Sequence, residues 1–328
     1  MNFKTRQYSQ FVVTLVIVLF SFNNNAFACK KHKKNKKNKT EQVTPKEEVE
    51  EIEFSNEESI KKIDSLLSIN FIESKYQKSK IYTARAFHKF QINDSLNAIE
   101  DCNKAIQLDS SYHYPYYLLS LYYGQNMEYQ KAIDIADIGM LNCQNETLKL
   151  FRLKANNLQA LGKYNEALSM YNILIDHDNN DGSNFFNKGT ILLLQRKYNA
   201  SINYFHNALY NYIDRNQGYD YEIAAYNNIA YAYLMQQNLN EFHHVLENYT
   251  KSLEIEKNID TYLGLCIMYY LQNNNEMLDK YFNLAIQERP NLKNGKQEII
   301  NMMKNDDFYY FPETIELLEE IFNQKLKK

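Results

Sequence analysis

Turn-forming residues and cysteines are scarce in this sequence. Its 328 residues include only 8 glycines and 4 prolines, whereas average usage is roughly 7% glycine and 5% proline. Many-stranded sandwiches, propellers and glycine-rich phosphate-binding folds need such residues at their turns, so the composition favours long helices with short connections. With Cys29 set aside, Cys102, Cys143 and Cys266 make no disulfide framework, and we expect them to be small buried hydrophobic residues.

The sequence also lacks a large net charge, and it lacks the usual catalytic and metal-binding motifs. The net charge is −3, which gives the whole chain no electrostatic bias toward nucleic acid. The sequence contains no glycine-rich phosphate loop, HExxH motif, paired-cysteine zinc pattern or nucleophile elbow. His243 and His244 are neighbours, and side chains about 100° apart on a helix cannot chelate one metal on one face. We therefore expect no metal, no cofactor, no nucleic-acid partner and no enzymatic activity.

The first 28 residues have the order of a secretory signal peptide. Lys4 and Arg6 precede an apolar run over 11–20, and small residues follow at 26–28. This apolar run is too short for a transmembrane helix, which takes about 20 residues. Cleavage after position 28 makes Cys29 the first mature residue. Cys29 is then either lipidated, as in bacterial lipoproteins, or unmodified in a simply secreted protein. The remaining alternative is that the segment is not cleaved and anchors the protein in the membrane. Each alternative predicts export, to the periplasm, the outer membrane or the medium.

Residues 29–54 are interpreted as a charged, disordered linker. Seven lysines lie within 30–39, and eight acidic residues lie within 41–58. Runs of like charge without apolar periodicity cannot bury a core. We interpret the linker as a spacer whose two halves partly neutralise each other. The alternative is that the lysine block contacts an anionic lipid or glycan and is itself the binding element.

A repeat of about 34 residues governs the rest of the chain. Small residues recur at spacings of 34, 35 and 34, at Ala98, Ala132, Ala167 and Ser201, and a tyrosine stands three residues before each of the last three. This pattern resembles the tetratricopeptide repeat, a helix–turn–helix unit with small residues where its two helices cross. The resemblance covers about 79–292. The units span 79–112, 113–147, 148–181, 182–215, 220–258 and 259–292.

The predicted fold is an all-α, right-handed superhelical solenoid of helix–turn–helix repeats with capping helices at its ends. In the fourth unit each helix carries one apolar stripe. Such a hairpin cannot bury its stripe alone, so stacked neighbours supply the core. Residues 55–78 are expected to hold an N-terminal capping helix, and 293–328 two C-terminal ones. The fifth unit departs from the pattern, because its second helix is longer or shifted.

The resemblance implies a binding groove. In the resembled family, the first helix of each unit lines a concave surface that holds an extended peptide or a partner's helix. Carried over by position, the groove residues are Tyr114, Tyr117, Leu121, Arg152, Asn156, Gln159, Phe186, Thr190, Leu193, Asn227, Tyr231 and Leu234. We expect Tyr117, Arg152, Phe186 and Tyr231 to form one contact line through successive units.

The sequence therefore predicts a non-catalytic protein-interaction scaffold of the bacterial cell envelope, which binds a peptide or partner segment. Tyrosine and arginine dominate binding hot spots because they bury much area and still form hydrogen bonds. A glycan- or cell-wall-associated module is the alternative, since tyrosines also stack on sugars, and carboxylates beside the aromatic residues would favour it. A regulatory subunit or holder of an exported enzyme is not separable from a scaffold by sequence.

Overall fold

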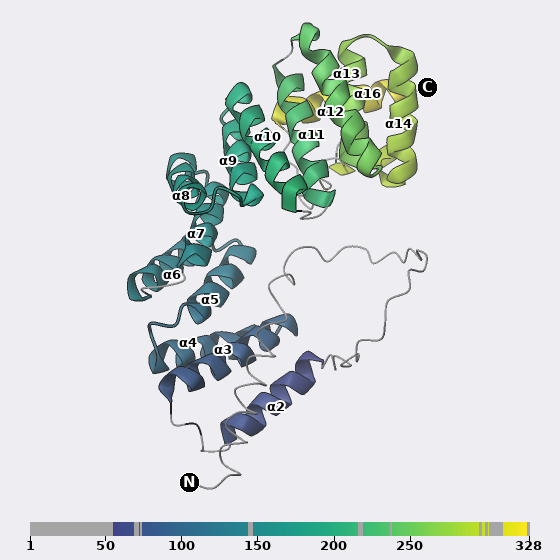
Figure 1. The fold of residues 1–328 in the computed structure, drawn as a ribbon. Helices are drawn as coiled ribbons and strands as arrows, with labels where there is room; N and C mark the ends of the chain where they lie inside the picture. Colours follow the sequence, from purple (N-terminus) through teal and green to yellow (C-terminus); the bar gives the residue numbers. More distant parts are fainter. Residues whose placement is uncertain are drawn as a thin grey trace, which may run out of the picture. The chain divides into compact units, whose positions relative to one another are not determined.

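The computed structural model contains helices joined by short turns, and no strand occurs among the residues that it describes (Figure 1). The expected all-α repeat fold is confirmed. The described residues are 55–68, 72, 74–143, 147–215, 219–236, 238–294, 297–298, 301 and 311–326. The signal sequence, Cys29 and the charged linker lie outside them, as does most of the first expected C-terminal capping helix. No helix in these ranges has the length and apolar character needed to cross a membrane.

In the described chain, a single helix, α2 (Asn56–Ser68), precedes a series of helical hairpins. The hairpin helices are α3 (Lys75–Gln91) and α4 (Ser95–Leu108), α5 (Tyr114–Gln125) and α6 (Tyr129–Asn142), α7 (Leu148–Ala160) and α8 (Tyr164–His177), α9 (Gly182–Leu194) and α10 (Tyr198–Arg215), α11 (Tyr219–Met235) and α12 (Phe242–Ile255), and α13 (Ile259–Leu271) and α14 (Asn275–Glu288). Short 3-10 helices, η1 (Leu239–Glu241) and η2 (Pro290–Asn294), precede α12 and follow α14. The last helix is α16 (Pro312–Leu326).

The fifth hairpin differs from the others at its turn rather than in the length of its second helix. α12 has 14 residues, the same as α4 and α6. It is shifted because η1 is inserted before it. The longer helices are α10, with 18 residues, and α3 and α11, with 17 each.

The turns of the hairpins repeat one backbone arrangement. Asn93, Met127, Gly162, Arg196 and Asn273 have positive φ angles, from 55° to 73°. At four of these turns the N–H of this residue bonds to the carbonyl three residues back, and the next N–H bonds five residues back. This is the Schellman motif that ends a helix. The left-handed conformation costs a non-glycine residue roughly 1–2 kcal/mol, and only one of these positions is glycine. The chain therefore makes tight turns with few glycines.

Two compact units divide the chain between Leu161 and Gly162, in the turn of the third hairpin. In unit 1, α2 packs on α3, and α3 to α7 pack against their neighbours in chain order. In unit 2, α8 to α14 do the same, and α16 packs on α13. Apart from α16, the helices therefore pack against helices close to them in the sequence, as expected for a repeat fold.

The small residues of the repeat lie in the core. Ala98, Ala132, Ala167 and Ser201 are all 0% exposed. Glycine serves the same purpose at Gly264, where a Cβ would lie 2.2 Å from ring atoms of the buried Tyr249. Small side chains thus allow neighbouring helices and aromatic rings to approach closely.

The three cysteines of the described chain, Cys102, Cys143 and Cys266, are free and buried. Burial raises the pKa of the Cys102 and Cys266 thiols, which keeps them protonated and unreactive. The interpretation of these cysteines as small buried hydrophobic residues is confirmed.

Candidate functional site

The first helices of the unit 1 hairpins carry no acidic residue. α3, α5 and α7 contain many aromatic residues, lysines and arginines, but neither aspartate nor glutamate. The acidic residues of these hairpins lie on the second helices α4 and α6 or in the turns. We call the exposed side of α3, α5 and α7 the first-helix surface of unit 1. Its composition is aromatic and cationic.

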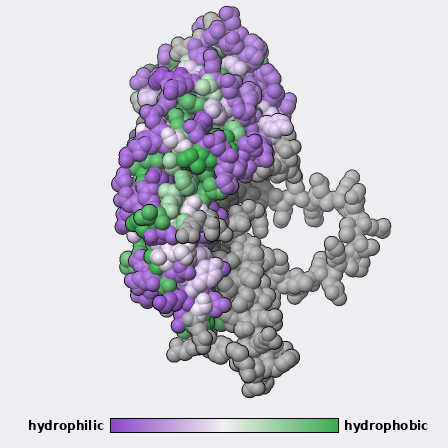
Figure 2. Space-filling model, turned by 60° about the vertical axis from the view of Figure 1, so that its left-hand side comes forward, coloured by the Kyte–Doolittle hydropathy of each residue, from purple (hydrophilic) through white to green (hydrophobic). Residues whose placement is uncertain are grey.

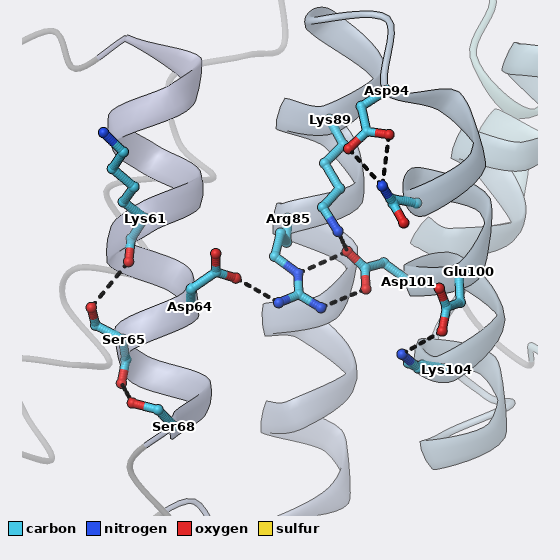
Figure 3. A network of polar contacts seen from close by, with 11 residues as sticks. Lys61, Asp64, Ser65, Ser68, Arg85, Lys89, Asp94, Glu100, Asp101 and Lys104 are labelled. Carbon is cyan, nitrogen blue, oxygen red and sulfur yellow. Dashed lines mark hydrogen bonds and ion pairs between the residues drawn. The ribbon is translucent and has the colours of Figure 1, made fainter.

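Some of these cations face the second helices and are neutralised there. The buried Asp101 carboxylate of α4 accepts hydrogen bonds from Arg85 Nε at 2.8 Å, Arg85 Nη2 at 2.7 Å and Lys89 Nζ at 2.8 Å. Arg85 Nη1 also binds Asp64 of α2 at 2.6 Å (Figure 3). The hydrogen bond to Asp101 raises the pKa of Arg85. This network joins α2, α3 and α4 and belongs to the structure of unit 1 rather than to its free surface.

Four tyrosines form a continuous row of ring contacts on the first-helix surface. The tyrosine row consists of Tyr76, Tyr112, Tyr114 and Tyr117, with successive ring centroids 5.7, 6.4 and 5.5 Å apart. Tyr112 is buried and anchors the row, whereas Tyr76 is 46% exposed and the other two are half-buried. The row connects the N-terminal ends of α3 and α5.

A lysine lies over each end of the tyrosine row. Lys80 Nζ is 4.5 Å from the ring centroid of Tyr76, and Lys149 Nζ is 6.0 Å from that of Tyr117 and 5.8 Å from that of Tyr114. In the described part of the chain, neither lysine forms an ion pair with a carboxylate. Both ammonium groups remain available to an acidic ligand, and cation–π contact holds them near the rings.

Arg152 adds a further cation beside the row. Burial raises the pKa of Tyr117, and the nearby charge of Arg152 acts in the opposite direction. Arg152 is half-buried, and Asn156, one helical turn further along α7, is exposed. Of the sequence-predicted site residues, the structure therefore brings together Tyr114, Tyr117 and Arg152.

A hollow of about 340 Å³ opens between the C-terminal halves of α3 and α5. Its aromatic wall includes Phe87, Phe90 and Tyr122, and the predicted Leu121 also lines it. Phe90 and Tyr122 stack with their centroids 4.8 Å apart, and asparagine and glutamine side chains form part of the rim. This α3–α5 hollow offers space for one bulky side chain next to the tyrosine row.

In unit 2 the corresponding surface is covered by the chain itself. Tyr231 of α11 is 0% exposed, its ring stacks on Phe311 with centroids 5.8 Å apart, and its hydroxyl lies 2.7 Å from Thr314 Oγ1 and accepts the Phe311 N–H at 2.9 Å. The expectation that Tyr231 lines an open groove is wrong, because residues 311–314 occupy the space in front of it. The expected groove residues Thr190, Leu193, Asn227 and Leu234 are buried as well.

The covering segment, residues 311–326, spans three hairpins of unit 2. Glu313 Oε1 pairs with Arg196 Nη2 at 2.6 Å in the turn of the fourth hairpin. At the other end, Phe322 packs edge-on against Phe282 of α14 with centroids 4.9 Å apart. Figure 1 shows α16 in yellow running across these helices. This expected capping helix thus covers the predicted groove residue Tyr231.

Phe186, the remaining predicted residue of unit 2, is half-buried. Its ring lies 5.3 Å from that of the fully buried Phe205, so Phe186 is partly committed to the core. Tyr231 is therefore missing from the expected contact line, which was to run through four successive repeats.

Apolar side chains are also exposed on the second helices. Leu96 of α4 is 84% exposed and Leu141 of α6 is 86% exposed. Figure 2 shows apolar residues among hydrophilic ones on one face of the molecule. Scattered exposed apolar residues are normal on protein surfaces, so exposure alone does not mark a site. The combination of stacked rings, two lysines without an ion-pair partner among the described residues, and a hollow distinguishes the first-helix surface of unit 1.

Among the described residues, no group of three His, Cys, Asp or Glu side chains is placed to hold a metal ion. The His243–His244 pair lies on α12, and the His244 ring stacks on Tyr233 with centroids 4.8 Å apart. Glu241 and Glu247 lie 3.5 and 3.8 Å from the two ring nitrogens of His244. These contacts account for the histidine pair as part of the surface of unit 2.

Comparison with known proteins gives similarity of fold. No protein-family model matches the sequence, and no curated protein matches it. The structure of PilW, a widely conserved type IV pilus biogenesis factor, has a TM-score of 0.54 at 15% identity and covers 65% of this chain and 94% of its own. Pseudomonas aeruginosa PilF has a TM-score of 0.53 at 15% identity, covering 66% and 95%. The C-terminal part of a TPR repeat-containing protein from Cytophaga hutchinsonii has 0.52 at 15%, covering 64% and 81%. The chain has the fold of the tetratricopeptide-repeat family.

Lys80 and Lys149 were not among the predicted groove residues, although they occupy the same position in their repeats as the predicted Tyr114. Tyr114 is the second residue of the unit 113–147, and the same position is Lys80 in the unit 79–112 and Lys149 in the unit 148–181. These are the lysines at the two ends of the tyrosine row. Carrying this position over to every repeat would therefore have found both lysines. The α3–α5 hollow has no such signal, because it depends on how two helices of different hairpins pack.

Proposed function

We propose that this tetratricopeptide-repeat protein is an interaction scaffold that binds a segment of a partner protein on the first-helix surface of unit 1. The observation that carries the proposal is the contrast between the two units. In unit 2, Tyr231 of the first helix α11 and Arg196 in the turn of the fourth hairpin bind a segment of the chain itself, through a buried ring contact, a hydroxyl contact and an ion pair. In unit 1 the side chains of Tyr114, Tyr117 and Arg152 are half-buried, and Lys80 and Lys149 have no acidic partner among the described residues.

Each part of the unit 1 surface supplies a different kind of contact. The exposed tyrosines offer flat apolar area together with hydroxyl groups, which is why tyrosine is frequent at binding hot spots. Arg152 and the two lysines supply charge-assisted hydrogen bonds to carboxylates. The α3–α5 hollow admits a bulky apolar side chain. A peptide segment provides all three kinds of group along one backbone.

The chemistry of the surface favours a peptide over a glycan. In sugar-binding sites that stack sugars on aromatic rings, carboxylates are common acceptors of hydrogen bonds from the hydroxyl groups. α3, α5 and α7 contain no aspartate or glutamate. A protein partner is therefore the better match for this surface.

Replacing Tyr117 or Arg152 with alanine is expected to weaken partner binding by about 2 kcal/mol or more, which is roughly a 30-fold increase in Kd. Both side chains are partly exposed, so helicity measured by circular dichroism should stay unchanged. The partner is first captured from envelope extract and identified by mass spectrometry. Its affinity for each variant is then measured by isothermal titration calorimetry.

Tyr210 supplies the matched control, because this tyrosine is 73% exposed on the second helix α10. Tyr210→Ala should leave the affinity unchanged. The binding site would instead lie in the linker if the affinity were unchanged in Tyr117→Ala and Arg152→Ala but fell when the lysine block 30–39 was removed.

We also propose that the chain is exported and acts in the bacterial cell envelope. The proposal is supported by the signal-peptide order of residues 1–28, which precede Cys29. Lipidation of Cys29 would hold the scaffold at a membrane, and two units in one chain would then present their surfaces from that anchor.

If Cys29 is lipidated, labelled fatty acid should be incorporated into the protein, and Cys29→Ser should abolish the incorporation. Only a cysteine at the first mature position can carry the lipid, so Cys143→Ser is the control and should leave the labelling intact. An intact mass that corresponds to an unmodified Cys29 at the N-terminus would establish simple secretion.

A further inference from the structure

We propose that residues 47–54 of this same chain, EEVEEIEF, dock on the first-helix surface of unit 1 when no partner is bound. The inference rests on the proposed function, since it names the chemistry that the surface recognises: an acidic segment with bulky apolar side chains. A partner segment then has to compete with the chain's own.

Charge and side-chain type match on the two sides. Five of the eight residues in 47–54 are glutamates, and the others are Val49, Ile52 and Phe54. The surface presents Lys80 and Lys149, each without a carboxylate partner among the described residues, and the α3–α5 hollow lies further along α3 and α5. Complementary charge fixes orientation and register more than raw affinity, and an apolar side chain in the hollow adds burial.

The segment joins the described chain next to the hollow. α2 starts at Asn56, whose Oδ1 lies 2.9 Å from Nδ1 of His88 near the C-terminal end of α3. The ring of His88 is 5.4 Å from that of Phe87, and Phe87 lines the hollow. The acidic segment therefore ends two residues before Asn56, which contacts the neighbour of the wall residue Phe87.

The length of the segment fits the distance from the hollow to Lys80. Phe87 and Lys80 are seven residues apart on α3, which is about 10 Å at 1.5 Å per residue. Eight extended residues span up to about 26 Å. With Phe54 or Ile52 in the hollow, the preceding glutamates reach Lys80 and the tyrosine row.

Attachment to the same chain makes even weak docking effective. A ligand on a short linker has an effective concentration of about 1 mM. If the free segment bound with a Kd of about 100 µM, the attached one would occupy the surface about nine-tenths of the time. Lys80 and Lys149 would then react with an amine reagent about tenfold more slowly than in the uncovered protein.

The test compares the chain that begins at residue 29 with a variant carrying Glu→Gln at 47, 48, 50, 51 and 53. Acetylation rates of individual lysines are measured by mass spectrometry at low ionic strength. Lys280 is the internal control, because it also lies over a tyrosine, 5.2 Å from the Tyr281 centroid, but in unit 2. We expect Lys80 and Lys149 to react about tenfold faster in the variant, with Lys280 unchanged. Ile52→Ser together with Phe54→Ser should also accelerate both.

Equal rates in the two proteins at Lys80 and Lys149 would overturn the inference, and so would equal acceleration at all three lysines. Either result leaves the proposed function standing if Tyr117→Ala still weakens partner binding. Conversely, Lys80 and Lys149 could be labelled faster while Tyr117→Ala leaves the affinity for the partner unchanged. That result would support docking of residues 47–54 and contradict the proposed function. The two ideas therefore fail separately.

Discussion

Tyr231→Ala is expected to destabilise unit 2 by about 3–5 kcal/mol, the range for removing a large buried aromatic side chain. The ring is fully buried and stacks on Phe311. Its hydroxyl holds Thr314 and the Phe311 N–H, so the variant leaves a cavity and two buried polar groups without their partner. Chemical unfolding followed by circular dichroism measures the loss of stability.

A second measurement places the loss in the structure. Hydrogen exchange should show the segment 311–326 losing protection in Tyr231→Ala before the hairpins of unit 1 do, because contacts in a repeat fold are local. Tyr231→Phe keeps the ring and removes only the hydroxyl, so it should cost about 1–3 kcal/mol. Tyr210→Ala, at an exposed tyrosine of the same unit, should be near neutral. If Tyr231→Ala instead left stability intact and abolished partner binding, Tyr231 would be a contact residue after all.

Tyr231 also marks the limit of what a repeated sequence reveals. The spacing of Ala98, Ala132, Ala167 and Ser201 is a local signal, because every unit meets the same packing problem at the same position. That signal predicted the all-α repeat fold correctly. The atoms that bury Tyr231 come from residues 80 and 83 positions further along the chain. A position within a repeat shows which side of the helix a residue lies on, but not what another segment places against it.

Only part of the candidate site can be predicted from positions within the repeat. Tyr114, Tyr117 and Arg152 follow from position within the unit, and the structure places them together. The α3–α5 hollow depends on packing between hairpins, which no single-unit pattern encodes. The turns illustrate a related limit: Met127 and Arg196 adopt positive φ, although neither residue type favours it, because the hairpin hydrogen bonds impose the conformation.

Asp101→Ala is expected to destabilise unit 1 by about 3–5 kcal/mol, the range for removing one partner of a buried ion pair. Asp101 is 1% exposed. The side chains of Arg85 and Lys89, both bound to it, are only 16% and 14% exposed. Removing the carboxylate leaves two partly buried cations without it, and α2 depends on the same network because Arg85 also binds Asp64. The free energy of unfolding, measured with urea, should fall, and hydrogen exchange should rise first in α2 to α4.

Glu100→Ala is the control that removes an exposed carboxylate instead of a buried one. Its side chain is 61% exposed and pairs with Lys104, four residues along the helix, so Glu100→Ala should change stability by no more than about 0.5 kcal/mol. A second comparison separates the loss of a partner from the worth of the ions themselves. Arg85→Met, Lys89→Met and Asp101→Leu together remove every charge at the centre of the network, and buried ion networks replaced in this way often lose no stability. We therefore expect the triple variant to be more stable than Asp101→Ala alone. If the triple variant were the less stable of the two, the ion network would itself stabilise unit 1, and the loss in Asp101→Ala would not come from uncompensated charge.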